Sequence, residues 1–444
     1  MTSRCRKQLA LFGLVPALSA PAQEAFQNML AGDSAAQARN QQMQAPQVQD
    51  YTFKEGDFRM LVTPSMGLEW NDNVNLADTN VLSDEIIMPA VGLRATYPWS
   101  ERNLLYLDVT VGYDWYLQHP RFSSFQFDSG SGTGLSFDMA IKDITLNLHD
   151  RLSYAQGAGQ AGAAGNPSTG TPSGGFVGTT ANGAVANTAT YGTFQNTAGL
   201  SATWDLNRVT LSAGYDHANV LATSGEFTDF NHASEMFFVR AGVQVQPRIT
   251  TGLETTVTLT TYQQDALNNN DAYTVGPYIE FRPDEFLKIT ARGGFTTYQY
   301  QDTSSTIQTS SQDSWYANVT LAHEVTDSVN YSLQAGREVQ LGVVSDLLAD
   351  WYVRPNITWK IIKDWQLTTF FFFEHGDEGV GSVGSLPGSP NGNFNWYGGN
   401  LSLTHAITSR ITLGLNYQLT FRTSELPNDG YTQNLVSLQL TYHP

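Results

Sequence analysis

Residues 409–444 read SRITLGLNYQLTFRTSELPNDGYTQNLVSLQLTYHP and contain two runs in which apolar and polar residues alternate. Period-two alternation makes a β-ribbon with one apolar and one polar face. Each run extends for about ten to twelve residues, whereas strands of globular proteins usually have roughly five or six. A tilted strand that crosses a membrane needs about nine to eleven residues. Length and alternation together predict a hairpin of outer-membrane β-strands.

The composition agrees with a single large barrel. The chain has 444 residues and a formal net charge of −18, but only 14% of its residues are charged. Nucleic-acid binding is not expected, because it requires basic patches. No stretch approaches the roughly eighteen consecutive apolar residues that indicate a membrane-spanning helix. Strands of a membrane barrel do not meet that criterion, because half of their side chains face a polar lumen.

The N-terminus has the three parts of a secretory signal peptide. Basic residues at positions 4, 6 and 7 precede an apolar run from Leu9 to Leu18, and residues 20–22 supply an A-x-A cleavage site. We therefore expect residues 1–22 to be a signal peptide, and the alternative is a buried N-terminal helix. The single cysteine, Cys5, lies in this segment, so we expect no disulfide or thiolate metal site in the mature chain.

The mature chain is expected to have two parts. Residues 23–50 are rich in Ala, Gln and Asn and show little apolar periodicity, which indicates a flexible lead-in. We therefore predict a flexible periplasmic N-terminal segment over residues 23–57 and an outer-membrane barrel over residues 58–444. A plug or partner-binding helix is the alternative for the N-terminal segment.

Two kinds of connection alternate along the barrel region. The short ones are 98–103, 141–144, 205–208, 246–249, 282–286, 326–329, 362–365 and 406–410. The long ones are approximately 71–83, 118–127, 155–190, 220–232, 263–271, 300–312, 343–348, 375–393 and 423–431. Short periplasmic turns and longer external loops are typical of transmembrane barrels. Their alternation predicts an all-β fold, a transmembrane antiparallel up-and-down barrel of about eighteen strands with both ends in the periplasm.

A β-propeller or another soluble β-solenoid is the alternative architecture. The short turns recur roughly every 40 residues, and Trp204-Asp205 spells the dipeptide found in one propeller family. A propeller blade needs four short strands for each repeat, whereas each repeat here contains two long strands. The strand length therefore favours the membrane barrel.

The polar residues of each strand should face the lumen. An Arg or Lys that faces lipid near the bilayer midplane costs about 2–4 kcal/mol. On this basis the candidate pore-lining residues are Asp108, Asp114, Asp138, Asp216, Arg240, Glu254, Glu280, Arg282, Lys288, Arg292, Arg354 and Lys360. Aromatic residues near the long connections, including Trp115, Trp351 and Trp396, predict an interfacial girdle. Asp150, His217, Arg337 and His375 break the alternation, and a β-bulge before Asp150 would restore its inward direction.

The predicted lumenal charges are unevenly distributed along the sequence. The basic candidates lie within residues 240–360, and four of the acidic ones precede them. One interpretation is a basic wall that faces an acidic wall and creates a transverse field for solute selection. The other is a set of structural salt bridges between neighbouring strands. The sequence leaves both open.

The beginning of the barrel resembles a known family. Residues 62–93 include Asn71-Asp72-Asn73-Val74, Ser83-Asp84 and a Pro89-to-Leu93 segment that contains Gly92. This order of motifs is similar to the opening of a bacterial family named β-barrel porin 2. The resemblance implies an outer-membrane barrel, and relatives of that family are associated with exopolysaccharide systems. It supplies no catalytic residues.

Other patterns were weighed as possible sites for chemistry. Residues 157–162 spell G-x-G-x-x-G, but no amphipathic helix follows, so a mobile surface loop over 155–192, or one folded into the lumen, is favoured over a dinucleotide site. His149 and Asp150 point to opposite faces of a strand and cannot form an acid–base pair without a bulge. Oxygen-bearing residues at 71–84 are better explained as solvated turn residues than as a Ca²⁺ site. We expect no catalytic residue, metal or cofactor.

The most consistent interpretation is a porin-like channel of the bacterial outer membrane for passive diffusion of small polar solutes. The first alternative is an export conduit for an exopolysaccharide, and a barrel enzyme is the least favoured. The expected partners are outer-membrane lipid, the transported solute or polysaccharide, and the barrel-assembly machinery, with a monomer or trimer left open. The last strand should pair with the strand near Phe58–Trp70, with Tyr442 as the terminal aromatic of the assembly signal.

Overall fold

The computed structural model describes residues 51–100, 102–128, 134–156, 192–223, 228–229, 231–301, 311–341, 347–380, 392–425 and 430–444. Its strands are β1 (Phe53–Glu55), β2 (Phe58–Asn71), β3 (Asp84–Ser100), β4 (Asn103–Tyr116), β5 (Ser124–Asp128), β6 (Leu135–Ile141), β7 (Ile144–Gln156), β8 (Gly192–Asp205), β9 (Val209–Ala222), β10 (His232–Gln246), β11 (Ile249–Tyr262), β12 (Asn270–Phe281), β13 (Leu287–Tyr300), β14 (Gln312–Thr326), β15 (Val329–Leu341), β16 (Leu347–Ile362), β17 (Trp365–Val380), β18 (Gly392–Thr408), β19 (Ile411–Ser424) and β20 (Tyr431–Tyr442). A 3-10 turn, η1 (Pro120–Phe122), follows β4. Within these ranges, no helix has the length and apolar character needed to cross a bilayer.

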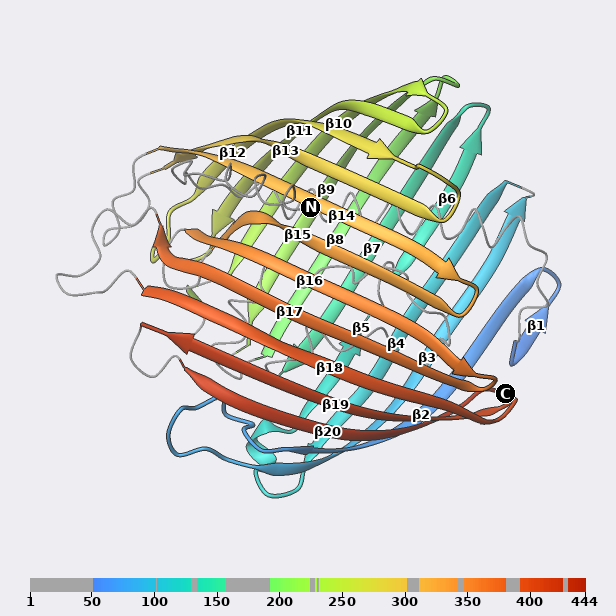
Figure 1. Cartoon of the computed structure of the whole chain (residues 1–444), viewed down its shortest axis with the longest axis vertical. Helices are drawn as coiled ribbons and strands as arrows, with labels where there is room; N and C mark the ends of the chain where they lie inside the picture. Colours follow the sequence, from blue (N-terminus) through green and yellow to red (C-terminus); the bar gives the residue numbers. More distant parts are fainter. Residues whose placement is uncertain are drawn as a thin grey trace, which may run out of the picture.

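The strands form one antiparallel sheet that closes on itself (Figure 1). β5 and β6 are two pieces of one spanning strand, because both pair with β4 on one side and with β7 on the other. β1 adds a short hairpin to the start of β2. The barrel therefore has eighteen spanning strands. The predicted all-β barrel and its strand number are confirmed, and the propeller alternative is wrong.

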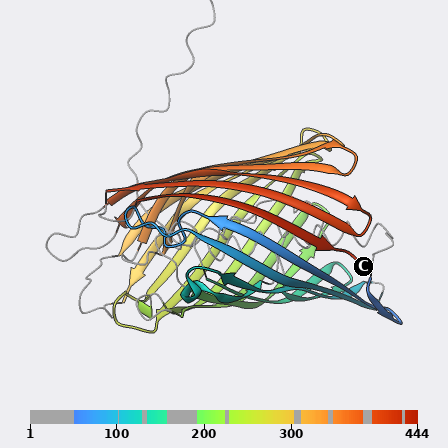
Figure 2. The same cartoon turned by 90° about the horizontal axis from the view of Figure 1, so that it is seen from below.

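The barrel closes between its first and last long strands. β2 pairs with β20 from Ser65↔Thr441 to Asn71↔Leu435. The part of β2 that precedes Ser65 in the sequence does not pair with β20, and its first residues, Phe58 to Met60, pair with β1 instead. The C-terminus and β1 lie at the same end of the barrel (Figure 1), and Figure 2 shows the C-terminus at that end from a second side. The predicted closing hairpin is confirmed, and the β1 hairpin was not foreseen from the sequence.

The eight predicted short turns all lie between consecutive strands at one end of the barrel. Two long connections differ from the prediction. β17 continues to Val380 and pairs through Glu378↔Gly392, although 375–393 was predicted as loop. η1 and β5 occupy most of the predicted loop 118–127. Strand pairing continues above the membrane, where either face of the sheet tolerates polar residues, so loss of alternation does not mark the end of a strand.

The two faces of the barrel differ in chemistry. Large apolar side chains project outward, and Phe295 on β13 and Trp99 on β3 are each 70% exposed. On the inward parity, polar residues such as Asp84, Ser136 and Glu338 are fully buried. An outward apolar band around a polar interior is the arrangement of a barrel that spans a membrane.

Asp150 is an exception on the outer face. The β6–β7 register reaches Asp150 and the β7–β8 register runs through it, both without a shift, so the predicted β-bulge before it is absent and that prediction is wrong. Its side chain remains outside and accepts a hydrogen bond of 2.6 Å from Asn196 Nδ2. The hydrogen bond from Asn196, rather than a β-bulge, therefore stabilises the Asp150 carboxylate on the outer face.

The other polar residues on the outer parity also have local partners. His217 Nδ1 lies 2.9 Å from Glu235 Oε1, and His375 Nδ1 lies 3.0 Å from Asn395 Oδ1. Arg337 donates from Nη1 to the backbone oxygen of Trp315 over 2.6 Å and is almost fully buried. The β14–β15 pairing ends at this arginine, so its side chain satisfies backbone beyond the ladder.

Candidate functional site

The inner face of the barrel collects the predicted pore-lining residues. Those that lie within strands occupy the inward parity, which the burial pattern of β10, for example, shows by its alternation from His232 to Arg240. Arg282 lies in the turn after β12. Their contacts divide them into several small polar clusters rather than one continuous site.

The largest cluster of cationic side chains surrounds Glu280. Its carboxylate lies 2.9 Å from Arg240 Nη2, 3.4 Å from Lys288 Nζ and 3.8 Å from Arg282 Nη2. The Arg240 guanidinium also stacks over the Tyr278 ring at 4.0 Å. Because β10 to β13 are consecutive strands, one carboxylate can reach all three cations. This cluster lies toward the short-turn end of the barrel.

A second cluster is centred on Arg354 of β16. Its Nε and Nη2 donate to Glu374 Oε1 over 2.8 and 2.6 Å, and Nη2 lies 3.5 Å from Glu338 Oε1. The Tyr352 ring covers the guanidinium at 4.3 Å. The arginine side chain is only 3% exposed. Desolvated charges of this kind require both partners, since an isolated buried ion is strongly unfavourable.

The acidic candidates of the first half of the chain have partners on adjacent strands, except Asp216, whose partner lies two strands away. Asp108 accepts from Arg94 Nη2 over 3.1 Å, and Asp114 accepts from Gln126 Nε2 over 2.9 Å. Asp138 accepts from Asn147 Nδ2 over 2.6 Å. Asp216 Oδ1 lies 2.7 Å from His149 Nε2. Arg94 and Asp108 form a salt bridge between neighbouring strands, whereas Asp114 and Asp138 are held by neutral amides. All of these contacts join near neighbours within one wall.

The remaining candidates occupy three different settings. Glu254 is buried and accepts from Tyr316 Oη over 3.3 Å. Arg292 is buried on β13. Lys360 is exposed and donates to the backbone oxygen of Asp327 over 3.4 Å. Lys360 therefore belongs to the rim of short turns, away from the clusters inside the barrel.

Aromatic residues on the inner face were not recognised from the sequence. Phe372 packs against Phe370 at 5.9 Å and Trp396 at 4.3 Å, and Tyr298 stacks on Tyr300 at 5.6 Å. Trp396 was assigned to the interfacial girdle, and that assignment is wrong because its position on β18 has inward parity and it is buried. The inward positions of β18, such as Gly398 and Asn400, have even residue numbers, and so does Trp396. This parity could have identified Trp396 as an inner-face residue, although it lies near a loop.

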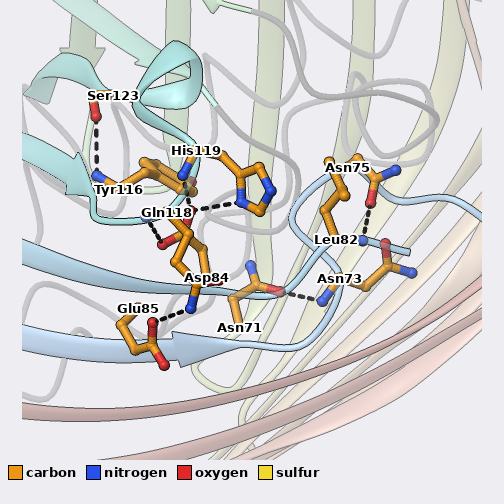
Figure 3. A network of polar contacts seen from close by, with 10 residues as sticks. All are labelled: Asn71, Asn73, Asn75, Leu82, Asp84, Glu85, Tyr116, Gln118, His119 and Ser123. Atoms are coloured by element: carbon orange, nitrogen blue, oxygen red, sulfur yellow. Dashed lines mark hydrogen bonds and ion pairs between the residues drawn. The ribbon is translucent and has the colours of Figure 1, made fainter. Parts of the chain in front are cut away.

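A polar network ties together the rim at the long-connection end of β2, β3 and β4 (Figure 3). Asp84 accepts from the backbone nitrogens of Gln118 and His119 over 2.9 and 2.7 Å, and its Oδ2 lies 3.0 Å from His119 Nδ1. Asn71 Oδ1 accepts from Asn73 N over 2.9 Å in the same view. The side-chain oxygens of Asn71 and Asp84, two of the residues considered for a Ca²⁺ site, therefore accept hydrogen bonds that fold the connections.

Accessibility of the inner face changes along the barrel axis. Near the long connections, Asp84, Glu338 and Asp350 are fully buried. Near the short turns, the side chains of Lys288 and Arg282 are partly exposed, the latter by 54%. The lumenal surface is therefore open to solvent mainly at the short-turn end, and densely packed at the other.

No family model matches the chain, so the resemblance to β-barrel porin 2 stays a prediction, and no curated protein matches it either. Several solved structures resemble it at low identity. Acinetobacter baumannii OccAB3 is 9% identical, with a TM-score of 0.46 over 87% of this chain and 99% of that one. Pseudomonas aeruginosa OccD3 (OpdP) is 10% identical, with a TM-score of 0.46 over 90% and 94%.

Proposed function

We propose that this chain is a channel of the bacterial outer membrane through which small polar solutes diffuse passively. The observation that carries the proposal is the charged inner face of an eighteen-strand barrel whose outer face is apolar. Barrels of about 16–18 strands can enclose an aqueous channel, whereas those of about eight are filled by side chains. The predicted signal peptide over residues 1–22 is consistent with export, and lies outside the described residues.

The pore-lining role belongs to the same proposal. Arg240, Glu280 and Lys288 offer hydrogen-bond donors and acceptors to a passing solute at the more open end of the lumen. The buried Arg354 cluster instead fixes neighbouring strands and narrows the path. Pairing offsets part of the desolvation cost of the charges buried in this wall.

A catalytic role is not proposed. His149, the base nearest to the centre of the β6–β9 wall, has both ring nitrogens within 2.8 Å of oxygens of Asn147 and Asp216. Its cross-strand partner Ser136 is fully buried. A nucleophile must be reachable by substrate and hydrogen-bonded to an available base. Neither condition holds for this serine–histidine pair.

An exopolysaccharide conduit is the second candidate. It is favoured by the dense packing of the inner face near the long connections, where Glu338 and Asp350 are fully buried. A barrel that is closed at rest and opened by periplasmic partners would have such packing. This candidate differs from the first in whether the isolated protein conducts ions.

The experiment is electrical recording from purified, folded protein in a planar lipid bilayer, with no other protein present. Stepwise ionic conductance, together with uptake of small sugars or amino acids into protein-containing liposomes, is the expected result. Protein that migrates as a folded barrel but gives no conductance would overturn the passive-channel proposal and favour the conduit. An empty bilayer and heat-denatured protein are the controls.

A further inference from the structure

Charge is distributed unequally between the two ends of the barrel. Within the described residues, the short turns and adjacent strand ends carry Lys54, Arg59, Arg102, Lys142, Arg208, Arg248, Arg282, Lys288, Lys360, Lys363 and Arg410. The same end carries Glu55, Asp57, Asp138, Asp143, Asp205, Glu280, Asp284, Glu285, Glu324, Asp327 and Asp364. Positive and negative side chains are therefore balanced there.

The middle of the barrel is also close to balanced. Arg94, Arg151, Arg240, Arg292, Arg337 and Arg354 accompany Asp108, Asp150, Asp216, Glu254 and Glu374. Several of these groups form the ion pairs described above, such as Arg94 with Asp108 and Arg354 with Glu374. Mid-barrel cations are thus largely neutralised where they lie, and do not form a continuous basic path.

The long-connection end is strongly negative. We define the acidic mouth as the carboxylates with described side chains that lie in the described connections or in the last four residues of each adjoining strand: Glu69, Asp72, Asp78, Asp84, Glu85, Asp114, Asp229, Glu235, Asp265, Asp271, Asp313, Glu338, Asp350, Asp377 and Glu425. By the same definition, the lysines and arginines of the described part are Arg121 and Arg422 alone. Arg337 lies one position outside the definition, and its guanidinium reaches the backbone oxygen of Trp315 at the edge of the mouth. Most of the net charge of −18 therefore lies at one mouth.

The sequence outside the described ranges strengthens this asymmetry. The stretches of sequence that join these strands outside the described ranges, such as 157–191 and 381–391, contain no lysine or arginine. The sign of this end of the barrel is therefore set by carboxylates.

We infer that the acidic mouth makes the channel cation-selective, so that its solutes are cationic or neutral rather than anionic. This inference rests on the proposed channel function and names its solute class. A mouth of one sign, walled by low-dielectric protein, raises the local concentration of counter-ions and repels ions of its own sign. Inward Asp114 continues the negative potential into the lumen.

The test is the reversal potential of the channel in a planar bilayer with a gradient of KCl. The expected potassium-to-chloride permeability ratio is above one, and it should fall as the salt concentration rises. Salt reduces the effect because the screening length shrinks from about 10 Å at 0.1 M to about 3 Å at 1 M. The mouth variant D78N/D229N/D265N removes three exposed carboxylates and should move the ratio toward one.

The matched control is the turn variant E55Q/D143N/E285Q, which removes three exposed carboxylates from the opposite end and should leave the ratio nearly unchanged. A wild-type channel that prefers chloride would overturn the inference while leaving the channel function intact. Equal shifts for both triple variants would also overturn the role of the mouth. Absence of any conductance is a different outcome, because it contradicts the channel function itself.

Discussion

Asp72 and Asn434 are 362 positions apart in the chain, yet two side-chain hydrogen bonds of 2.7 Å join them. Asp72 Oδ1 accepts from the backbone nitrogen of Asn434, and Oδ2 accepts from its Nδ2. The Asp72 backbone nitrogen returns a bond of 3.1 Å to the Asn434 oxygen. These contacts begin where the β2–β20 ladder ends at Asn71↔Leu435. These three hydrogen bonds between Asp72 and Asn434, called the clasp below, join the first and last long strands where the barrel closes.

Replacing Asp72 with alanine should weaken this seam. The substitution leaves two donors of Asn434 without their acceptors, which typically costs about 1–3 kcal/mol in free energy of unfolding. Urea unfolding of the lipid-embedded protein, followed by tryptophan fluorescence, measures the change. Asp78→Ala, in the same connection but exposed, is the control and should be nearly neutral. Equal stability of the two variants would refute the clasp.

Gly199 permits a contact that no larger residue would allow. It lies in register between His149 and Asp216, so the histidine reaches the aspartate across a position without a side chain. A Cβ at Gly199 would collide with the Asp216 carboxylate and the Tyr215 backbone oxygen. Gly199→Ala should therefore destabilise the barrel by about 1–3 kcal/mol, the usual cost of overpacking.

Gly414→Ala is the matched control, because the nearest atom to a Cβ there is Gln439 O at 3.9 Å. Both glycines lie within strands, so the loss of backbone freedom is comparable. Urea midpoints of the two variants separate steric collision from a general glycine effect. If Gly199→Ala is as stable as Gly414→Ala, the histidine–aspartate contact does not depend on the glycine.

The sequence was sufficient to predict the number and order of the spanning strands, but not β1, η1 or β5. Alternation over β19 and β20 gave the strand type, and turns such as 246–249 were placed correctly because short connections interrupt that alternation sharply. The side of each residue followed from parity, which is why Asp108 and Arg354 could be proposed for the inner face. These are local properties of the chain.

The contacts between strands could not be derived in the same way. Which carboxylate meets Arg354 depends on the stagger of β15, β16 and β17, and no local pattern encodes that stagger. The asparagine-rich motif at 71–73 was noticed, but its partners Gln433 and Asn434 lie on the last strand. Trp396 was misassigned because nearness to a loop outweighed its parity. The sequence pattern of a single strand does not contain the register between strands that are distant in the chain.

Removal of Arg354 should destabilise the barrel more than removal of another inner-face arginine. Arg354→Met leaves Glu374 and Glu338 buried without their shared cation, and breaking such a pair typically costs about 3–5 kcal/mol. Arg282→Met is the control, since that side chain is 54% exposed and 3.8 Å from Glu280. Exposed pairs contribute only about 0–1 kcal/mol. Urea unfolding should therefore rank the two variants clearly, and the reverse order would contradict the buried cluster.

The last prediction concerns the end of β20. Deleting Leu440–Pro444 removes the Ser65↔Thr441 and Met66↔Leu440 pairs of the seam and the Ile411↔Tyr442 pair with β19. The edge of β2 would then present unpaired backbone groups at membrane depth, where no water can satisfy them. We expect this truncation to abolish membrane insertion, as measured by heat-modifiable migration and by resistance to urea extraction. Deleting His443 and Pro444 alone removes one backbone bond, from His443 N to Arg410 O, and should insert normally. Normal insertion of the longer truncation would show that the seam closes without the end of β20. If neither truncated protein inserts, the residues required for insertion include His443 or Pro444.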